Sequence, residues 1–333
     1  MHLRQGLTFD DVLLVPKHST LRTRKQVNIG VDLGKNVRLA IPLISANMKS
    51  VTEAAMAQAV GHLGGFGLLH RFMPVEDQVQ MWRQCRKTTI LVGASVGVKP
   101  EEIARADALA NAGCRVICVD VAHGDSEGCV RMVQYISTHH PHVLIIAGNV
   151  ATADGAMRLY EAGADVIKVG VGPGSLCTTR IETGNGMPQL TALMDVAQAR
   201  KEANAQFTII ADGGIKNAGD MVKALCFADA VMLGNLLAGT DESPGELIAI
   251  NDQKYKQYNG SSTHKPSHIE GVTAMVSYRG PVVRVITKLM EGLRSGCSYQ
   301  GAHDLNDLKK GPEFVLISHA GLTESHPHNV ILN

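Results

Sequence analysis

Short apolar runs alternate with longer amphipathic segments along most of the chain. The runs are rich in β-branched residues and show no alternation of apolar and polar positions, which is typical of strands buried on both faces of a parallel sheet. Most of them start roughly 22 to 27 residues after the previous one, the length of one strand and one helix. The pattern predicts eight strands: Ile41–Met48, Phe66–Arg71, Ile90–Gly97, Val116–Gly124, Val143–Val150, Val166–Gly172, Phe207–Ile215 and Ala230–Ala238.

The segments between these runs have the signals of helices. Thr52–Leu63 carries its apolar residues at helical spacing, and Pro100 followed by two glutamates is typical of a helix start. Eight strands that alternate with helices predict a single (β/α)8 TIM barrel with parallel strands over residues 1–333. From about Asp241 the sequence predicts irregular structure up to a helix at Val282–Gly292, and a loose polar tail at His319–Asn333.

Composition excludes several classes of protein. The 32 Lys and Arg residues nearly balance the 31 Asp and Glu residues, and aromatic residues make up only 4% of the chain, which argues against nucleic-acid binding. There is no apolar run of the roughly 18 residues that a membrane helix needs, and the first residues lack the apolar core of a secretion signal. Seven cysteines without CxxC spacing do not indicate a disulfide framework. We therefore expect a cytoplasmic protein with free thiols.

The stretch Val169–Arg180, VGVGPGSLCTTR, is the most informative for chemistry. Its glycines and proline interrupt both helix and strand and leave backbone N–H and C=O groups open to a ligand. Because active sites of barrels lie at the carboxyl ends of the strands, Cys177 is placed to act as a nucleophile. The alternative is that Cys177 is one of several buried thiols, since free cysteine usually behaves as a small core residue.

Two later strand ends indicate a phosphorylated ligand. Asp212 is followed by Gly213 and Gly214, and the next strand ends at Gly234 and Asn235. Loops after the seventh and eighth strands often bind phosphate in barrels, and a carboxylate can bind sugar hydroxyls. A nucleotide is the simplest such ligand. The alternative is that these glycines only form tight turns.

The motif VGVGPGSLCTTR resembles the cysteine loop of the IMP dehydrogenase/GMP reductase family. The resemblance covers almost the whole chain through LTFDDVLLVP, ISANMKSVTEAAMA, DVAHG, AGNVAT, ADGGI, GTDESPGE and GLRSGCSYQGA. It implies a barrel that assembles as a homotetramer and binds a purine nucleoside monophosphate, with a cysteine that attacks C2 of the base. Family members either oxidise IMP to XMP with NAD or reduce GMP to IMP and ammonia with NADPH.

The resemblance also implies roles for individual residues. Cys177 matches the nucleophile, and Thr179 with Glu270 matches a pair that relays a proton to the leaving amine. Substrate binding is implied for Met48, Ser175, Asp212, Gly213, Gly214, Gly234, Asn235 and Tyr258. Asp120 and Asn149 match the nicotinamide side, and the backbone carbonyls of Gly172, Gly174 and Cys177 match a site for a monovalent cation such as K⁺.

Two departures bear on the choice between the reactions. Only one helical segment separates Arg71 from Ile90, so the regulatory modules that dehydrogenases usually carry are not inserted there. In a short active-site flap at about 258–275, only Ser261–Ile269 lies between Gly260 and Glu270, without the Arg-Tyr pair with which dehydrogenases activate water. We therefore expect a GMP reductase that uses NADPH, with an IMP dehydrogenase lacking the modules as the alternative. Lys49, where the family often has Asp, leaves any contact at that position open.

The same barrel is consistent with two further hypotheses about function. A flavin-dependent oxidoreductase is possible because phosphate sites at the seventh and eighth strands also hold flavin phosphate. A nucleotide sensor that kept the fold without activity is a non-enzymatic reading. The complete set of Cys177, Thr179 and Glu270 argues against the sensor.

Overall fold

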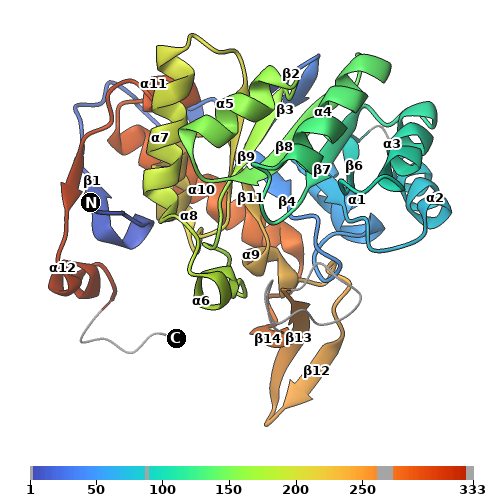
Figure 1. Ribbon diagram of the computed structural model, residues 1–333. Coiled ribbons are helices and arrows are strands. Elements are labelled where there is room, and N and C mark those ends of the chain that lie inside the picture. Colours follow the sequence, from blue (N-terminus) through green and yellow to red (C-terminus); the bar gives the residue numbers. More distant parts are fainter. Residues whose placement is uncertain (1–2, 87–89, 261–272, 328–333) are drawn as a thin grey trace.

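The centre of the molecule is a closed barrel of eight parallel strands (Figure 1). The computed structural model describes residues 3–86, 90–260 and 273–327. The barrel strands are β4 (Leu43–Ser45), β5 (Phe66–Leu69), β6 (Val92–Val96), β7 (Val116–Asp120), β8 (Leu144–Val150), β9 (Val166–Val169), β10 (Thr208–Asp212) and β11 (Ala230–Leu233). They follow one another around the barrel in chain order, and β11 pairs with β4 to close it. This confirms the predicted (β/α)8 fold.

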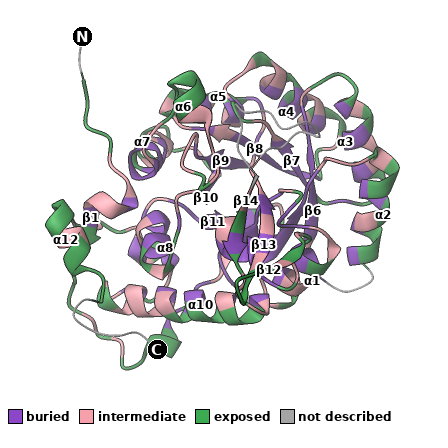
Figure 2. Cartoon of the chain, turned by 90° about the horizontal axis from the view of Figure 1, so that it is seen from below, coloured by how far each residue is buried: buried purple, intermediate pink, exposed green. Residues whose placement is uncertain are grey.

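Helices cover the outside of the barrel, with buried inner faces and exposed outer faces (Figure 2). The longer helices are α1 (Ala54–His62), α2 (Val75–Cys85), α3 (Glu102–Asn111), α4 (Glu127–His139), α5 (Ala153–Glu161), α7 (Gln189–Glu202), α8 (Ala218–Leu225) and α10 (Val282–Tyr299). Small residues let these layers approach each other closely. A β-carbon at Gly67 on β5 would lie 2.5 Å from the Cα atom of Ala57 on α1. None of the helices in the described part of the chain is long and apolar enough to cross a membrane.

The barrel strands are apolar over nearly their whole length, as continuous burial requires. Every residue of β5, β6 and β9 is buried. All the predicted strands except β8 were too long at their carboxyl ends; for example, β10 ends at Asp212 and β11 ends at Leu233. The glycines that follow these two residues turn the chain away from the barrel, so the polar residues there belong to loops.

The first and last strands of the chain pair outside the barrel. β1 (Val12–Leu14) is antiparallel to β15 (Phe314–Leu316), and the short helix η1 (Phe9–Asp11) precedes β1. The hairpin of β2 (Val31–Gly34) and β3 (Val37–Leu39) lies against the amino ends of barrel strands; for example, Lys35 pairs with Asp165 just before β9. The hairpin therefore lies at the end of the barrel opposite to the strand ends that the sequence analysis singles out.

The prediction of irregular structure after Asp241 was wrong. A three-stranded antiparallel sheet of β12 (Leu247–Ile250), β13 (Gln253–Asn259) and β14 (Thr273–Ser277) projects from the barrel (Figure 1). The helix predicted to end at Gly292 continues as α10 to Tyr299. The predicted loose tail contains α12 (His319–Glu324), and η2 (Arg24–Gln26) and α11 (Leu305–Leu308) are further short helices.

Candidate functional site

Two adjoining pockets open at the carboxyl ends of the barrel strands, on the side from which α6 (Thr179–Thr183), α9 (Asn235–Ala238) and the β12–β14 sheet project (Figure 1). Residues common to both pockets include Met48, Gly174, Ser175, Asp212, Gly213 and Tyr258. The first pocket adds Asp120, Asn149, Gly172, Cys177 and Thr179, and the second adds Gly214, Gly234 and Asn235. The structure thus brings together every predicted site residue that it describes. Glu270 lies outside the described residues.

Cys177 belongs to a segment that leaves the barrel after β9 and returns before α7. We call residues 172–186 of this segment the cysteine loop. The backbone N–H of Cys177 donates to the carbonyl of Gly174 at 3.1 Å, and its sulfur lies 3.3 Å from the hydroxyl oxygen of Thr179. Cys177 is partly exposed, whereas the other six cysteines are all buried. The alternative of a buried core thiol is therefore wrong for Cys177.

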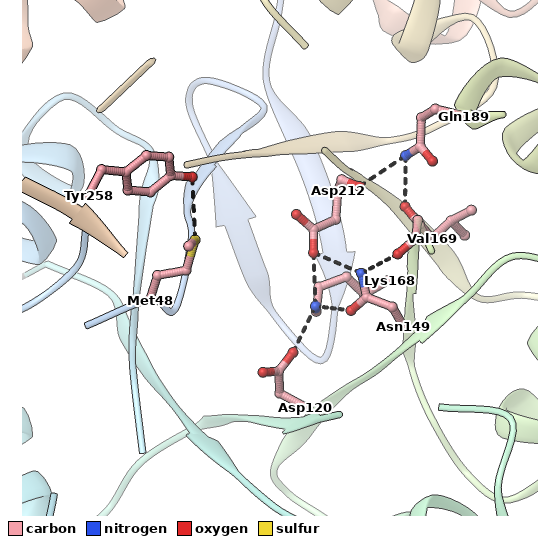
Figure 3. Close-up of polar contacts among 9 residues, drawn as sticks. Met48, Asp120, Asn149, Lys168, Val169, Gln189, Asp212 and Tyr258 are labelled. Atoms are coloured by element: carbon pink, nitrogen blue, oxygen red, sulfur yellow. Dashed lines mark hydrogen bonds and ion pairs between the residues drawn. The ribbon is translucent and has the colours of Figure 1, made fainter. Parts of the chain in front are cut away.

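A lysine that the sequence analysis did not single out lies at the floor of the first pocket. The Nζ atom of Lys168 on β9 is 2.8 Å from the carboxylate of Asp120 and 2.9 Å from that of Asp212, and it also donates to the side-chain oxygen of Asn149 (Figure 3). Only 3% of the Lys168 side chain is exposed. One buried ammonium group therefore joins residues from the ends of β7, β8 and β10.

The charges in this network stabilise each other. Burial alone would raise the pKa of Asp120, but the Lys168 ammonium group and a hydrogen bond from Asn47 outweigh it, so the pKa lies below its ordinary value. Burial would lower the pKa of Lys168, but the charges of Asp120 and Asp212 raise it well above its ordinary value. The Asp120 carboxylate and the Lys168 ammonium group are therefore both charged at neutral pH.

Asp212 is fixed on two sides. The amide nitrogen of Asn149 donates to its Oδ2 atom at 2.9 Å, and the buried amide of Gln189 donates to its backbone carbonyl at 3.2 Å and to the carbonyl of Val169 at 2.9 Å (Figure 3). Lys168 also donates to Oδ2. The Oδ1 atom of Asp212 has no hydrogen bond within the described residues, so it is available to a ligand hydroxyl.

The signal for Lys168 was present in the sequence. It is the only charged residue within the run VIKVGVG, and a lysine in a strand buried on both faces needs a carboxylate partner. Its partners lie 48 residues before it and 44 residues after it, so the pairing depends on the order of strands around the barrel. Gln189 gave no such signal, because polar residues are common at helix starts.

The second pocket has the glycines and hydroxyls expected around a phosphate. Tyr258 on β13 is only 3% exposed, and its hydroxyl oxygen is 3.7 Å from the sulfur of Met48 (Figure 3). Burial raises the pKa of Tyr258 to about 12, against a smaller opposing effect of a hydrogen bond with Ser175. A β-carbon at Gly234 would lie 2.9 Å from the Tyr258 hydroxyl oxygen, so glycine leaves room there for the tyrosine side chain.

The first pocket also has features that suit a nicotinamide ring, and the cysteine loop has features that suit a monovalent cation. Phe72, Val121 and Ala122 line the pocket beside Asp120 and Asn149, so a flat ring meets apolar surface and its amide meets polar groups. Within the cysteine loop, the carbonyls of Gly172, Gly174 and Cys177 are oxygen ligands of the kind that alkali cations prefer. No cluster of three or more His, Cys, Asp or Glu side chains suited to a metal ion occurs in residues 3–86, 90–260 and 273–327.

Comparison with known proteins shows the class to which this site belongs. Residues 6–328 match the model of the IMP dehydrogenase / GMP reductase domain, so the chain belongs to this family of oxidoreductases of purine metabolism. The chain is similar to the inosine-5′-monophosphate dehydrogenases of Borreliella burgdorferi (36% identity, covering 98% of each chain), Bacillus subtilis (33%, covering 98% of this chain and 96% of the relative) and Nitrosopumilus maritimus (32%, covering 100% of each).

The named relatives favour one of the two family reactions. The relatives above are all called IMP dehydrogenases, which supports the alternative reading of the sequence better than the expected GMP reductase. The alignment with the Nitrosopumilus protein runs over 477 positions and includes all 333 residues of this chain, so that relative has segments without a counterpart here.

Proposed function

We propose that the chain transfers a hydride at C2 of a purine nucleoside 5′-monophosphate through a covalent bond between the purine and Cys177. The observation that carries this proposal is the position of the thiol. Cys177 is the one cysteine of the seven that is not buried, and it lines the pocket formed by Thr179, Asp120, Asn149 and Asp212. A nucleophile, a hydroxyl that can pass on a proton and anchoring groups for a ribose converge there.

We propose oxidation of IMP to XMP as the leading direction, because the relatives that cover the chain almost completely carry the name IMP dehydrogenase. The sulfur of Cys177 attacks C2 of IMP. Bound NAD supplies the hydride acceptor, and loss of hydride from C2 leaves a thioimidate on Cys177. Water then adds at C2, the carbon–sulfur bond breaks, and XMP leaves while the thiol is restored.

Reduction of GMP to IMP with NADPH is the second candidate, and one observation favours it. No arginine and no tyrosine lies between Gly260 and Glu270, so this segment lacks the pair with which the dehydrogenases of the family activate water. In this direction the sulfur of Cys177 attacks C2 of GMP, and ammonia leaves after it gains a proton. Bound NADPH supplies hydride to C2, and IMP leaves as the carbon–sulfur bond breaks.

Thr179 and Glu270 can serve either reaction. A hydroxyl relayed to a carboxyl group can deliver a proton to a leaving amine or accept one from an attacking water. The contact of Thr179 with the sulfur of Cys177 supports this role, because that sulfur would bond to the reacting carbon.

The remaining roles follow the two pockets. We assign the ribose hydroxyls to Asp212 and the phosphate to Ser175, Gly213, Gly214, Gly234, Asn235 and Tyr258, with Met48 beside the base. Asp120 and Asn149 would hold the nicotinamide side of NAD or NADPH. The carbonyls of Gly172, Gly174 and Cys177 would bind K⁺. A cytoplasmic homotetramer is part of the same proposal.

A paired assay tests the function. Purified protein is given IMP with NAD in one reaction and GMP with NADPH in the other, each in the presence of potassium. Formation of XMP and NADH supports the leading direction, and release of ammonia with loss of NADPH supports the second. Failure of both reactions, together with nucleotide binding, would favour a nucleotide sensor.

A further inference from the structure

Arg180, the second residue of α6, lines the second pocket but is assigned no role in the reaction proposed above. Its side chain runs between the two ends of the cysteine loop. A β-carbon at Gly172 would lie 2.5 Å from the Nε atom of Arg180, and a β-carbon at Gly186 would lie 2.7 Å from its Cγ atom. Both glycines have positive φ angles, 89° and 154°. Glycine at these two positions therefore makes room for the arginine side chain.

The polar end of the same side chain closes the base of the loop. The Nη2 atom of Arg180 donates to the carbonyl of Met187, and the backbone N–H of Met187 donates to the carbonyl of Val171 at 3.2 Å. The Nε atom is buried and has no hydrogen-bond partner among the described residues. The arginine is thus held by the shape of the surrounding backbone and by the carbonyl of Met187, the residue that follows the loop.

Two further contacts of the cysteine loop are the packing of Leu176 against the core and a hydrogen bond between Ser175 and Tyr258. None of the residues 172–186 is buried, so apolar packing contributes little to its conformation. Thr179, whose hydroxyl contacts the sulfur of Cys177, is the residue next to Arg180 in the same short helix. A shift of Arg180 would therefore move the helix that presents Thr179 to the sulfur.

We propose that Arg180 is a positioning residue that ties the two ends of the cysteine loop together and so fixes Cys177 and Thr179 over the first pocket. The role of Arg180 in holding the loop does not depend on any reaction. The effect of Arg180 on turnover rests on the proposed function.

Alkylation of Cys177 by iodoacetamide tests the proposal directly. Because the other six cysteines are buried, Cys177 is expected to react first, and peptide mass spectrometry identifies the modified site. The Arg180→Met variant keeps a side-chain stem but loses its donors. We expect alkylation of Cys177 to become about fivefold faster because the loop opens more often. The Arg180→Lys variant retains a stem and a donor for the Met187 carbonyl and should restore most of the wild-type rate.

The pH dependence of alkylation separates positioning from a direct effect of charge. If Arg180 acted only by favouring the thiolate, Arg180→Met would shift the midpoint of the pH profile upward and leave the plateau rate unchanged. Positioning predicts a higher plateau at the same midpoint. A shifted midpoint with an unchanged plateau would therefore overturn the proposal, as would wild-type alkylation in Arg180→Met.

Two glycines of the same loop provide a matched pair of variants. Gly186 contacts the Arg180 stem, whereas Gly184 has a φ of 69° and no atom within 4 Å of an added β-carbon. Both alanine variants strain the backbone, Gly186→Ala with its φ of 154° more than Gly184→Ala, and only Gly186→Ala also displaces Arg180. Gly186→Ala should reproduce the faster alkylation of Arg180→Met, and Gly184→Ala should stay within about twofold of the wild type. Equal effects of the two would contradict the proposal.

Turnover gives the last measurement. Misplacement of a reacting group by about 1 Å can lower a rate by as much as 100-fold, so we expect kcat of Arg180→Met to fall about tenfold while KM for the nicotinamide cofactor changes less than about twofold. A wild-type protein without turnover whose alkylation follows the pattern above would refute the proposed function and leave the role of Arg180 intact. Normal turnover in Arg180→Met would overturn the role of Arg180 alone.

Discussion

The floor of the first pocket and the cysteine loop above it are built in opposite ways. The floor consists of Asp120, Lys168 and Asp212 on neighbouring barrel strands, where an ammonium group that is 3% exposed joins two carboxylates. The cysteine loop has no buried residue and depends on glycines and on the side chain of Arg180. The anchoring groups thus share the rigidity of the barrel, while the reactive sulfur lies on a segment that contributes little to its stability. Mutations should therefore separate stability from turnover.

The largest separation is expected at Cys177. Cys177→Ser removes the nucleophile, and turnover should fall at least about 10⁴-fold, as is usual when a covalent nucleophile is lost. Because this thiol is not part of the core, the free energy of unfolding should change by less than about 0.5 kcal/mol. Steady-state kinetics and urea unfolding measure the two quantities. Retention of activity would remove the covalent mechanism, and titration with IMP should show that the nucleotide still binds.

Lys168→Met should instead lower the stability of the fold. It leaves two partly buried carboxylates without their cation, and the free energy of unfolding should fall by up to about 3–5 kcal/mol. Lys256→Met is the matched control, because Lys256 is also buried but donates to the carbonyls of Thr240 and Ser243. Lys256→Met leaves no carboxylate without a cation, and its free energy of unfolding should fall by about 1–3 kcal/mol. Equal losses in urea unfolding would mean that the ion pairs of the floor contribute nothing beyond hydrogen bonding.

The contribution of Asp120 to the stability of the floor should be lost only at acidic pH. The pKa of Asp120 in the folded protein lies below its ordinary value of 3.8, so its contribution to stability is complete above that value and is lost as the pH falls through the folded pKa. The difference in unfolding free energy between the wild type and Asp120→Asn should therefore be constant from pH 5 to pH 8 and shrink below about pH 4. A difference that shrinks between pH 6 and pH 8 would contradict the assignment.

The smallest effect is expected at Tyr258, which lines both pockets. Tyr258→Phe keeps the buried ring and removes one hydroxyl, so the Kd for IMP should rise about threefold to tenfold, as for one hydrogen bond, with little change in unfolding. Because its pKa is about 12, the effect should not vary between pH 6 and pH 9. Calorimetric titration at several pH values checks both statements.

The sequence predicted the architecture from local patterns, and local patterns together with the family resemblance singled out most of the residues that line the two pockets. Eight apolar runs identified the barrel strands, and their polar ends identified Asp120, Cys177 and Asp212. Lys168 was passed over because it lies inside an apolar run, and its two partners become apparent only when the strands are arranged around the barrel. Arg180 was part of a motif that the sequence analysis quoted, but its fit between two glycines depends on φ angles that the motif does not specify.

The segments after Asp241 were missed for a different reason. The strands β12–β14 form a small sheet in which several apolar residues, including Leu247, Ile250 and Met275, are exposed. Such strands lack the buried apolar pattern that marks a barrel strand, so pattern reading finds no strand there. The exposed short helix α12 gives equally little signal, because none of its residues is buried.

The pairing of β1 with β15 also bears on the second pocket. Residues Thr8, Phe9 and Asp10, just before β1, form one wall of the second pocket, and Lys223 donates to the carbonyl of Phe9 at 2.7 Å. β1, which follows that wall directly, therefore pairs with the last strand of the described chain, about 300 residues downstream. A nascent chain that has completed all eight barrel strands therefore still lacks the strand that pairs with β1 beside the second pocket.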